Sequence, residues 1–266
     1  MRVVSVHPTA IVSPDAELGR DVVVGPFAVI ENGTTIGDGC EVRAHATVKA
    51  GTRLGRRNRV HEGAVIGGEP QDLSFQGGET GLVVGDGNVF REGVTLHRST
   101  KPGGATVVGS DCFLMAYVHV AHDNRLGDGV ILANNVMLAG HVEIGSRAFL
   151  GGGAGVHQFC RVGRLAMVGG NAKVVQDCLP FVMTDGSPAR ARGLNLVGLR
   201  RAGFAASQLR TLKEAYRLLL RCSLPQPEAL LRLSQMQDPL VEEMIAFVRG
   251  SKRGIAHAHR ALADEF

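Results

Sequence analysis

Hydrophobic residues recur along this chain at every sixth position from Val6 to Val174. Twenty-six of the twenty-nine positions in that series are apolar, and the exceptions are Asp72, Gly78 and Pro102. An α-helix repeats every 3.6 residues and an ordinary strand every two, so neither produces this period. The pattern predicts a three-sided prism in which six residues form one strand and one corner, and about 18 residues complete a coil.

Small residues and glycines mark the expected corners. Small side chains such as Ala10 and Cys40 stand four residues after the aliphatic position, and glycine often follows that position directly, as at Gly19 and Gly37. We interpret these glycines as relieving backbone strain where the chain turns. Stacked coils pair their strands in parallel, so the predicted fold class is mainly β, a parallel β-helix over residues 1–176. The period does not determine the hand of the coil.

The pattern changes after the prism. Residues 177–198, with Pro180, Gly186, Pro188 and Gly193, are interpreted as a linker. Residues 199–266 are predicted to form a C-terminal α-helical domain, because apolar residues recur there at spacings of three and four. Further helices are expected at 227–236 and 241–249. This domain would cover the open end of the prism, which otherwise exposes strand edges, and could also bind a partner.

Composition and charge narrow the class of protein. The chain of 266 residues has 36 Gly, 10 Phe, 2 Tyr and no Trp, which suits a narrow aliphatic interior. The net charge of +4 is scattered, so no nucleic-acid-binding surface is predicted. Neither a long apolar run nor a signal-peptide pattern is present, so no integral membrane segment is expected. Five cysteines without paired spacing fit a cytoplasmic location.

Two interruptions of the repeat, at residues 67–82 and 98–107, are predicted to be loops on a binding face. Between and after them lie five histidines: His97, His119, His122, His141 and His157. The spacings from His122 to His141 and from His141 to His157 are each close to one coil, which predicts a ladder of imidazoles on one wall. His119 and His122 are expected to point to opposite sides unless a corner intervenes.

Three interpretations of the histidines follow from the residues. The side chains could simply bond to the surface backbone, or hold a metal ion, although the pair at 119 and 122 has weak ligand spacing. They could also line a polar substrate cleft with one histidine as general base, because a neutral imidazole can take a proton from a sugar hydroxyl near pH 7. Asp123 is then the nearest carboxylate to orient that ring.

Several motifs in register with the repeat carry a family resemblance. They are QDL from Gln71, VTLHR from Val94, AHD from Ala121, LAGHV from Leu138, VHQF from Val156, MVGG from Met167 and NLVGLRRAGF from Asn195. Together they closely resemble the UDP-N-acetylglucosamine O-acyltransferase family over essentially the full chain. The resemblance implies left-handed coiling and a homotrimer with active sites between subunits. It also implies transfer of a 3-hydroxyacyl chain from acyl carrier protein to the 3-hydroxyl of the UDP-sugar, the first step of lipid A biosynthesis. No cofactor or metal is implied beyond the thioester donor.

The resemblance also implies residue roles. His122 would be the general base, Asp123 its orienting partner, and the Gly140 N–H the donor to the oxyanion. Substrate contacts would come from Asp72, His97, His119, His141, His157 and Gln158. Asn195 and Arg201 would reach the nucleotide from a neighbouring subunit. Gly170 matches the position that closes the acyl channel, and its lack of a side chain implies a long acyl chain.

Three residues depart from the family pattern: Ser74 where Lys is common, Val197 where an acidic residue is common, and Ala202 in place of a second Arg. Lys101 or Lys173 could replace the missing cation. These departures leave open a 3-amino analogue of the acceptor sugar. Two different classes of protein also stay open. One is a zinc hydratase of the γ-carbonic-anhydrase type, which needs three converging histidines. The other is a non-catalytic scaffold, and the presence of His122, Asp123 and Gly140 argues against it.

Overall fold

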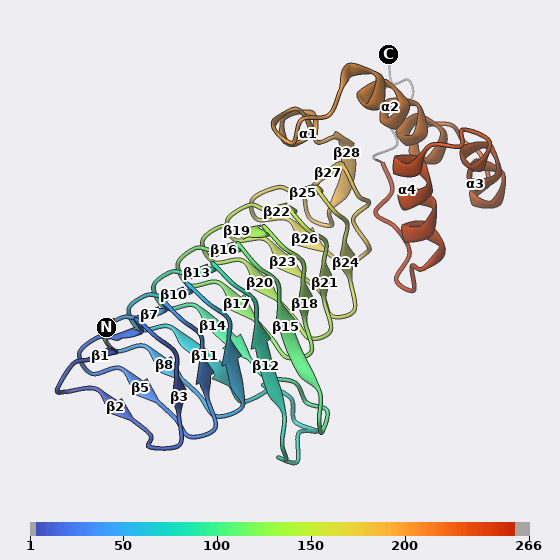
Figure 1. The fold of residues 1–266 in the computed structure, drawn as a ribbon. Coiled ribbons are helices and arrows are strands. Elements are labelled where there is room, and N and C mark those ends of the chain that lie inside the picture. The colour runs from blue at the N-terminus through green and yellow to red at the C-terminus, as the bar shows by residue number, and fades with distance from the viewer. Residues whose placement is uncertain (1–3, 259–266) are drawn as a thin grey trace.

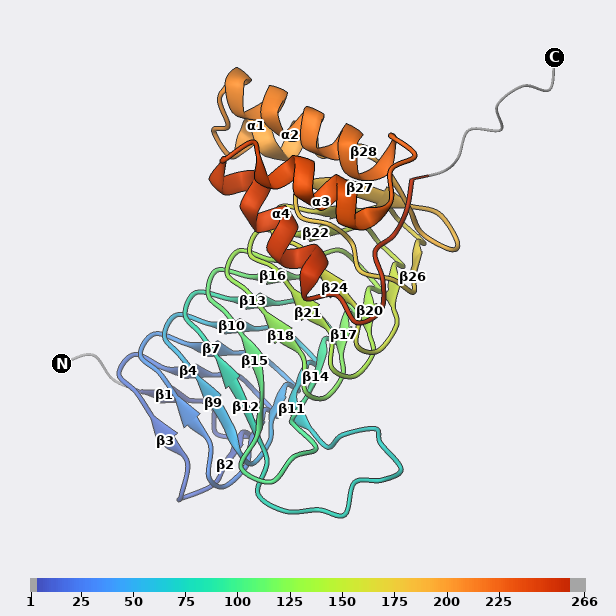
Figure 2. The same cartoon turned by 90° about the vertical axis from the view of Figure 1, so that its right-hand side faces the viewer.

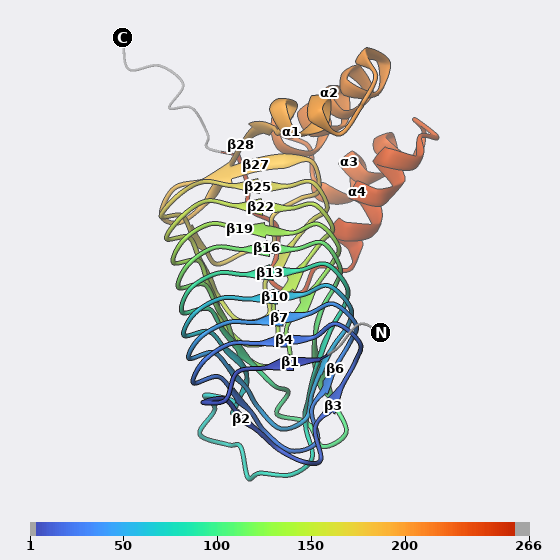
Figure 3. The ribbon, with the colours of Figure 1, turned by 60° about the vertical axis from the view of Figure 1, so that its left-hand side comes forward.

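The computed structural model describes residues 4–258 as a three-sided parallel β-helix with helices at its C-terminal end (Figure 1). Each coil gives one short strand to each of three sheets, so hydrogen-bonded neighbours are strands three apart in the chain order. Figure 3 shows the coils stacked one above another along the prism. The mainly β class and the β-helix architecture predicted from the hexad repeat are confirmed.

The three sheets contain eleven, nine and eight strands among the described residues. The first sheet consists of β1 (Ser5–Val6), β4 (Val23–Val24), β7 (Glu41–Val42), β10 (Arg59–Val60), β13 (Val89–Phe90), β16 (Phe113–Leu114), β19 (Ile131–Leu132), β22 (Phe149–Leu150), β25 (Met167–Val168), β27 (Val182–Asp185) and β28 (Arg190–Leu194). The second consists of β2 (Ile11–Val12), β5 (Val29–Ile30), β8 (Thr47–Val48), β11 (Val65–Gly68), β14 (Thr95–His97), β17 (His119–Val120), β20 (Met137–Leu138), β23 (Gly155–Val156) and β26 (Lys173–Val174). The third consists of β3 (Glu17–Leu18), β6 (Thr35–Ile36), β9 (Thr52–Leu54), β12 (Gly81–Val84), β15 (Ala105–Val108), β18 (Arg125–Leu126), β21 (Glu143–Ile144) and β24 (Arg161–Val162).

The hexad positions supply the core of the prism. Val24, Phe90 and Leu132 are each 0–2% exposed, as are most of the later members of the series. Val6, in the first coil, is 42% exposed because no earlier coil covers it. Burial of one aliphatic side chain per strand stabilises the fold by roughly 1.5–3 kcal/mol each, and this explains why so narrow a prism needs an almost unbroken series.

The two insertions preserve the phase of the repeat. Most strand partners are three hexads apart, as Ser5 and Val23 are. Leu54 instead pairs with Val84, five hexads later, and Val84 pairs with Val108, four hexads later. The first insertion therefore adds two whole hexads to its coil and the second adds one. They leave the prism between β11 and β12 and between β14 and β15, on the same side of the prism (Figure 2).

The corners have a common backbone conformation that the sequence interpretation missed. The third residue after each inward-facing position takes a positive φ near 60° in most coils. This residue need not be glycine, as Phe27, Asp123 and His141 show. Gly19 and Gly37, which we expected at the strained position, do not have positive φ. Their role is close approach: a Cβ at Gly37 would lie 2.6 Å from the carbonyl oxygen of Gly55 in the next coil.

Residues 177–198 do not form an irregular linker. They contain β27, which pairs in parallel with β25, and β28, which returns antiparallel to β27. The hairpin covers the edge of β25, which would otherwise present unpaired backbone groups. Asn195 then caps a first helix by accepting a hydrogen bond from the Gly198 N–H, so the helical part begins at Leu196 rather than 199.

Four helices follow the hairpin within the described residues: α1 (Leu196–Arg201), α2 (Ala206–Leu220), α3 (Gln226–Ser234) and α4 (Pro239–Arg249). Their apolar faces form a second core with the hairpin, and α4 is tied to the prism by the ion pair of Arg164 with Glu243, 2.7 Å apart. The helices stand over the C-terminal end of the prism (Figure 2). The last part of the predicted helical domain, 259–266, lies outside the described residues. None of the described helices has the length and apolar character needed to span a bilayer.

Candidate functional site

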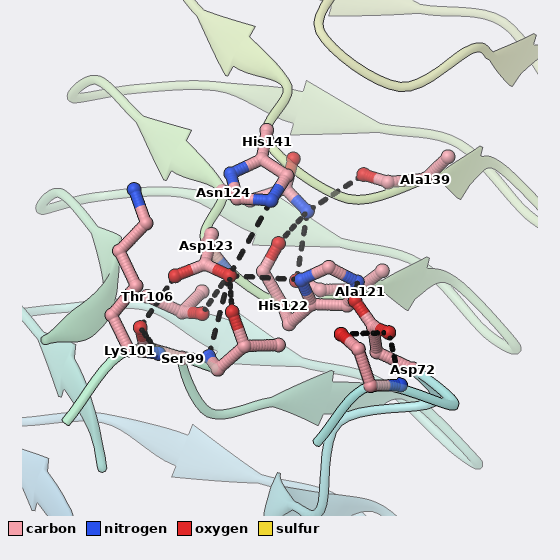
Figure 4. A network of polar contacts seen from close by, with 12 residues as sticks. Asp72, Ser99, Lys101, Thr106, Ala121, His122, Asp123, Asn124, Ala139 and His141 are labelled. Carbon is pink, nitrogen blue, oxygen red and sulfur yellow. Dashed lines mark hydrogen bonds and ion pairs between the residues drawn. The ribbon is translucent and has the colours of Figure 1, made fainter.

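A cluster of polar residues lies at one edge of the prism, where β17 turns into β18 and β20 turns into β21. The turn after β17 carries His122 and Asp123, and the turn one coil later carries Gly140 and His141. Both Asp123 and His141 occupy the positive-φ position of their corners. Both insertions extend to this edge, and the first brings Asp72 to within 3.8 Å of the His122 ring (Figure 4).

His122 and Asp123 form a hydrogen-bonded pair. The Nδ1 of His122 lies 2.9 Å from Oδ2 of Asp123, and His122 is only 7% exposed. With the proton on Nδ1, where an ionised carboxylate accepts it, the lone pair is on Nε2. The Nε2 atom lies 3.8 Å from Oδ2 of Asp72. The pair therefore has the arrangement of a general base whose tautomer is held by a carboxylate.

Asp123 is held ionised by the second insertion. Burial alone would raise its pKa, but hydrogen bonds from Ser99, Thr100 and His122 outweigh burial and hold the pKa well below its ordinary range. The hydroxyl of Thr100 donates to Oδ2 at 2.7 Å, and the hydroxyl of Ser99 donates to Oδ1. The Thr106 hydroxyl accepts from the backbone N–H of Asp123 at 2.8 Å. None of these three hydroxyl residues was singled out from the sequence.

Gly140 faces the ring of His122. A Cβ on Gly140 would lie 2.5 Å from Cε1 and 2.7 Å from Nε2 of His122, too close for any real contact. Only glycine therefore lets the backbone approach the base this closely. Among the hydrogen bonds of the described residues, none involves the Gly140 N–H. The backbone of Gly140 thus lies directly beside the Nε2 side of the His122 ring.

The histidine ladder forms in part. The rings of His122 and His141 meet edge to face with centroids 5.2 Å apart, as the one-coil spacing predicts. His157 does not continue the ladder. Phe159, three hexads after His141, stacks on that ring at 4.7 Å instead. His157 and Gln158 are exposed, and the His157 Nδ1 lies 3.2 Å from the Gln158 carbonyl oxygen.

His97 and His119 form a second pair beside the first. Their ring centroids are 4.9 Å apart, and the Nδ1 of His119 lies 2.7 Å from the Thr95 hydroxyl. Burial lowers the pKa of His97 to about 4 and also lowers the pKa of His119. Both rings are therefore neutral near pH 7. A corner intervenes between positions 119 and 122, because β17 ends at Val120 and the chain turns at His122, so the condition under which the two side chains would oppose each other is not met.

Asp72 lies at the tip of the first insertion. Its carboxylate accepts from the Ser74 backbone N–H at 2.8 Å and from the Ser74 hydroxyl at 2.7 Å. These bonds lower the pKa of Asp72. The residue that departs from the family pattern thus has a local role here, because it fixes the carboxylate that faces His122.

A groove of about 820 Å³ leads away from the paired corners toward the end of α4. Its lining includes Lys101, Asp123, Arg125, His141, Phe159 and Arg161. A larger cavity, about 1050 Å³, is lined by the α2–α3 connection and residues 255–258 and contains no member of the histidine cluster. The smaller groove is the one that adjoins the cluster, because Asp123 and His141 line it.

The remaining predicted residues lie elsewhere in this chain. Asn195 caps α1 and donates from Nδ2 to the carbonyl of Leu165, and Arg201 is exposed at the end of α1. No contact of either with the histidine cluster is found among the described residues. Gly170 is exposed, and a Cβ there would meet only the Gly152 carbonyl, at 3.3 Å. Val197 is exposed, and Ala202 is the C-cap of α1.

A metal ion has two candidate sets of ligands among the described residues. One is His122, Asp123 and His141, and the other is His61, Glu62 and Glu92. The first set offers two histidines and a carboxylate, whereas a γ-carbonic-anhydrase-type site needs three histidines. One nitrogen of that set is already hydrogen bonded to the carboxylate. Neither set among the described residues of this chain supplies the three histidines of the zinc alternative.

The fold and the paired corners define a hexapeptide-repeat acyltransferase. The model of the bacterial transferase hexapeptide family (six repeats) matches residues 105–140, which include His122, Asp123 and Gly140. The model described as UDP N-acetylglucosamine O-acyltransferase, domain 2, matches residues 177–256.

Relatives with named activities narrow this class. An acyl-(acyl-carrier-protein)–UDP-N-acetylglucosamine O-acyltransferase of Burkholderia orbicola (strain MC0-3) is 49% identical over 257 residues, which are 94% of this chain and 98% of that protein. A protein of the same name from Synechocystis sp. is 46% identical, with 74% of this chain and 72% of that protein covered. The crystal structure of UDP-N-acetylglucosamine O-acyltransferase from Moraxella catarrhalis RH4 superposes with a TM-score of 0.92 at 39% identity, covering 95% of this chain and 99% of the other. This chain belongs to the UDP-N-acetylglucosamine O-acyltransferase family and is an acyltransferase. The left-handed coiling implied by the resemblance is confirmed, because superposition preserves the hand of a coil.

Proposed function

We propose that this chain transfers a 3-hydroxyacyl group from acyl carrier protein to the 3-hydroxyl of UDP-N-acetylglucosamine, the first step of lipid A biosynthesis. The observation that carries the proposal is the His122–Asp123 pair facing the Gly140 backbone, in a member of this family. No cofactor takes part, and the thioester of the carrier protein is the acyl donor.

The reaction begins with proton transfer. Nε2 of His122 removes the proton of the sugar 3-hydroxyl while the oxygen attacks the thioester carbonyl carbon. The positive charge that forms on the ring is stabilised by Asp123, which stays ionised because Ser99 and Thr100 donate to it. A positioned general base of this kind contributes roughly 10²–10⁴-fold to a rate.

The tetrahedral intermediate carries its negative charge on the former carbonyl oxygen. The Gly140 N–H donates to that oxygen, and one such donor is worth about 10²–10³ in kcat. The intermediate then collapses by breaking the carbon–sulfur bond. His122 returns its proton to the departing sulfur, so the products are the O-acyl sugar nucleotide and the free thiol of the carrier protein.

Substrate contacts are proposed from the residues around the pair. Asp72, His97, His119 and His141 surround the base, and His157 and Gln158 are exposed one coil beyond His141. The basic residues of the groove, Lys101, Arg125 and Arg161, suit an acidic partner or a diphosphate. Lys101 is therefore our candidate for the cation missing at Ala202, since Lys173 does not line the groove.

We propose a homotrimer in the cytoplasm. Apolar side chains are exposed on the prism, with Tyr117 at 67% and Met137 at 52%, and such residues favour contact with another copy. A neighbouring subunit could then bring Asn195 and Arg201 to the groove. All five cysteines are free, which suits a reducing compartment. Light scattering of the purified protein tests the oligomer, and a monomer would contradict it.

The function is tested by a mass-spectrometric transfer assay. Purified protein receives UDP-N-acetylglucosamine or its 3-amino analogue together with a series of 3-hydroxyacyl carrier-protein donors. We expect an O-acyl product with the 3-hydroxyl sugar and a turnover lower by orders of magnitude in His122→Ala, with the same oligomeric state. If only the 3-amino sugar gives a product, an amide, then that sugar is the acceptor instead. Full activity of His122→Ala would refute the assignment of His122 as the base.

A further inference from the structure

Asn124 is a fully buried amide directly behind the catalytic corner. It follows Asp123 in the chain, is 0% exposed, and has no access to substrate. Its Nδ2 donates to the carbonyl of Ala121 at 2.7 Å and to the carbonyl of Ala139 at 3.0 Å, and its Oδ1 accepts from the Val142 N–H at 3.0 Å (Figure 4). One side chain thus joins the corner of the base to the corner of the oxyanion donor.

The two carbonyls identify what these bonds control. The Ala139 carbonyl belongs to the peptide group whose N–H is that of Gly140, and the Ala121 carbonyl belongs to the peptide group that leads into His122. A trans peptide is planar with its oxygen and hydrogen on opposite sides, so fixing the oxygen also fixes the direction of the N–H. A hydrogen bond to the oxygen polarises the peptide and strengthens its N–H as a donor.

We propose that Asn124 is a positioning residue for acyl transfer, which holds the Gly140 N–H at a set direction and distance from His122. The inference rests on the proposed function of His122 and Gly140. The bond that carries the effect is the one from Nδ2 of Asn124 to the carbonyl oxygen of Ala139.

The rest of the prism shows that the fold does not require an amide at this position. Asn124 stands four residues after an inward-facing hexad residue, and the same position holds alanine at Ala46 and Ala64. At Cys40 and Cys112 the thiol reaches the carbonyl 15 residues later, at 3.1 and 3.2 Å, which is the counterpart of the Ala139 carbonyl. A cysteine at position 124 therefore keeps the critical bond, whereas an alanine removes that bond and also the acceptor of the Val142 N–H.

A matched control exists elsewhere on the prism. Asn88 occupies the same hexad position, is also 0% exposed, and donates from Nδ2 to Gly85 and Asn58 while its Oδ1 accepts from the Cys112 N–H. It lies at the corner between β12 and β13, which belongs to a different edge of the prism from that of Asn124. Loss of its bonds tests stability without touching the catalytic corners.

The kinetic experiment compares Asn124→Ala, Asn124→Cys and Asn88→Ala with the wild type in the transfer assay. We expect kcat to fall about tenfold or more in Asn124→Ala with KM unchanged, a fraction of the effect of losing an oxyanion donor outright. We expect Asn124→Cys to keep kcat within about threefold, since the net contribution of one hydrogen bond is modest. Asn88→Ala should keep kcat while losing a similar amount of thermal stability. Wild-type kcat in Asn124→Ala, an equal loss in Asn88→Ala, or a change in KM alone would overturn the inference.

A second measurement separates this inference from the proposed function. The chain contains four Ala–Gly pairs, whose glycines are Gly51, Gly140, Gly155 and Gly203. When the carbonyl carbon of alanine and the nitrogen of glycine (¹⁵N) are both labelled, only the amides of these four glycines are selected in the spectrum of the intact protein. We expect the Gly140 proton signal to move upfield in Asn124→Ala and to stay in Asn88→Ala. If the wild type forms no product but this signal moves, the proposed function fails while the positioning of the peptide stands. An unmoved Gly140 signal refutes the positioning itself.

Discussion

Replacing Gly140 by alanine tests the geometry of the site most directly. The new Cβ would lie 2.5 Å from Cε1 and 2.7 Å from Nε2 of His122, whereas ordinary contact begins at 3.4 Å. The ring must therefore move by nearly 1 Å, and its hydrogen bond to Asp123 and its contact with His141 resist that movement. The backbone N–H at position 140 is retained, so the loss should arise from the base and not from a missing donor.

A misplacement of about 1 Å costs on the order of 10²-fold in rate, or about 2.7 kcal/mol of transition-state stabilisation. We expect Gly140→Ala to lower kcat by about that factor, measured with saturating substrates in the transfer assay. Gly152→Ala is the matched control: it lies at the same hexad position, and its Cβ would be no nearer than 3.3 Å to another atom. Wild-type turnover in Gly140→Ala, with folding confirmed by circular dichroism, would refute the claim that the base and the glycine share one tight contact.

Three further variants test other parts of the site. Asp123→Asn should lower kcat by about 10³–10⁴ because the amide favours the wrong tautomer of the base; a loss below tenfold would contradict the pairing seen here. The double variant Ser99→Ala, Thr100→Val removes the bonds that hold the pKa of Asp123 low. A depressed carboxyl pKa stabilises the folded state above the unfolded value of about 3.9 and ceases to do so as the pH falls through the folded pKa. The double variant should therefore be less stable than wild type at pH 7, and the gap should narrow below about pH 4 in urea unfolding; a gap independent of pH would count against this account. Gly170→Met should shorten the preferred acyl chain in the donor series, and an unchanged preference would refute the channel assignment.

The repeat in the sequence was sufficient to predict the prism and the limits of its core. Val24 and Leu132 are buried because each six-residue unit turns its hexad residue toward the axis of the prism. The direction of that side chain depends only on the strand to which it belongs. The insertions left the phase intact because they add whole hexads, so the prediction also held beyond residue 82. The sequence motifs likewise indicated His122, Asp123 and Gly140, which the fold brings together at adjacent corners.

The repeat did not predict which side chains of different coils contact one another. Thr100 reaches Asp123 from 23 residues away, along a loop whose course no periodicity describes. Phe159 rather than His157 stacks on His141, because a side chain follows the corner position it occupies and not its approximate distance along the chain. The hairpin in residues 177–198 was equally unpredictable, since its strands form to cover an edge that exists only once the prism has coiled.

Local periodicity thus decided which side of the wall each residue faces, and with it the fold, the core and the edge that carries the chemistry. The tertiary structure alone decided which polar groups meet across that edge. Asn124 illustrates the difference: in the sequence it is one small polar residue at a corner, like Asn88. Only the stacking of the next coil places the Ala139 carbonyl within 3.0 Å of its amide and so connects it to the Gly140 N–H. Hydrogen bonds between coils depend on distances set by the whole prism, and such distances are not encoded in any one hexad.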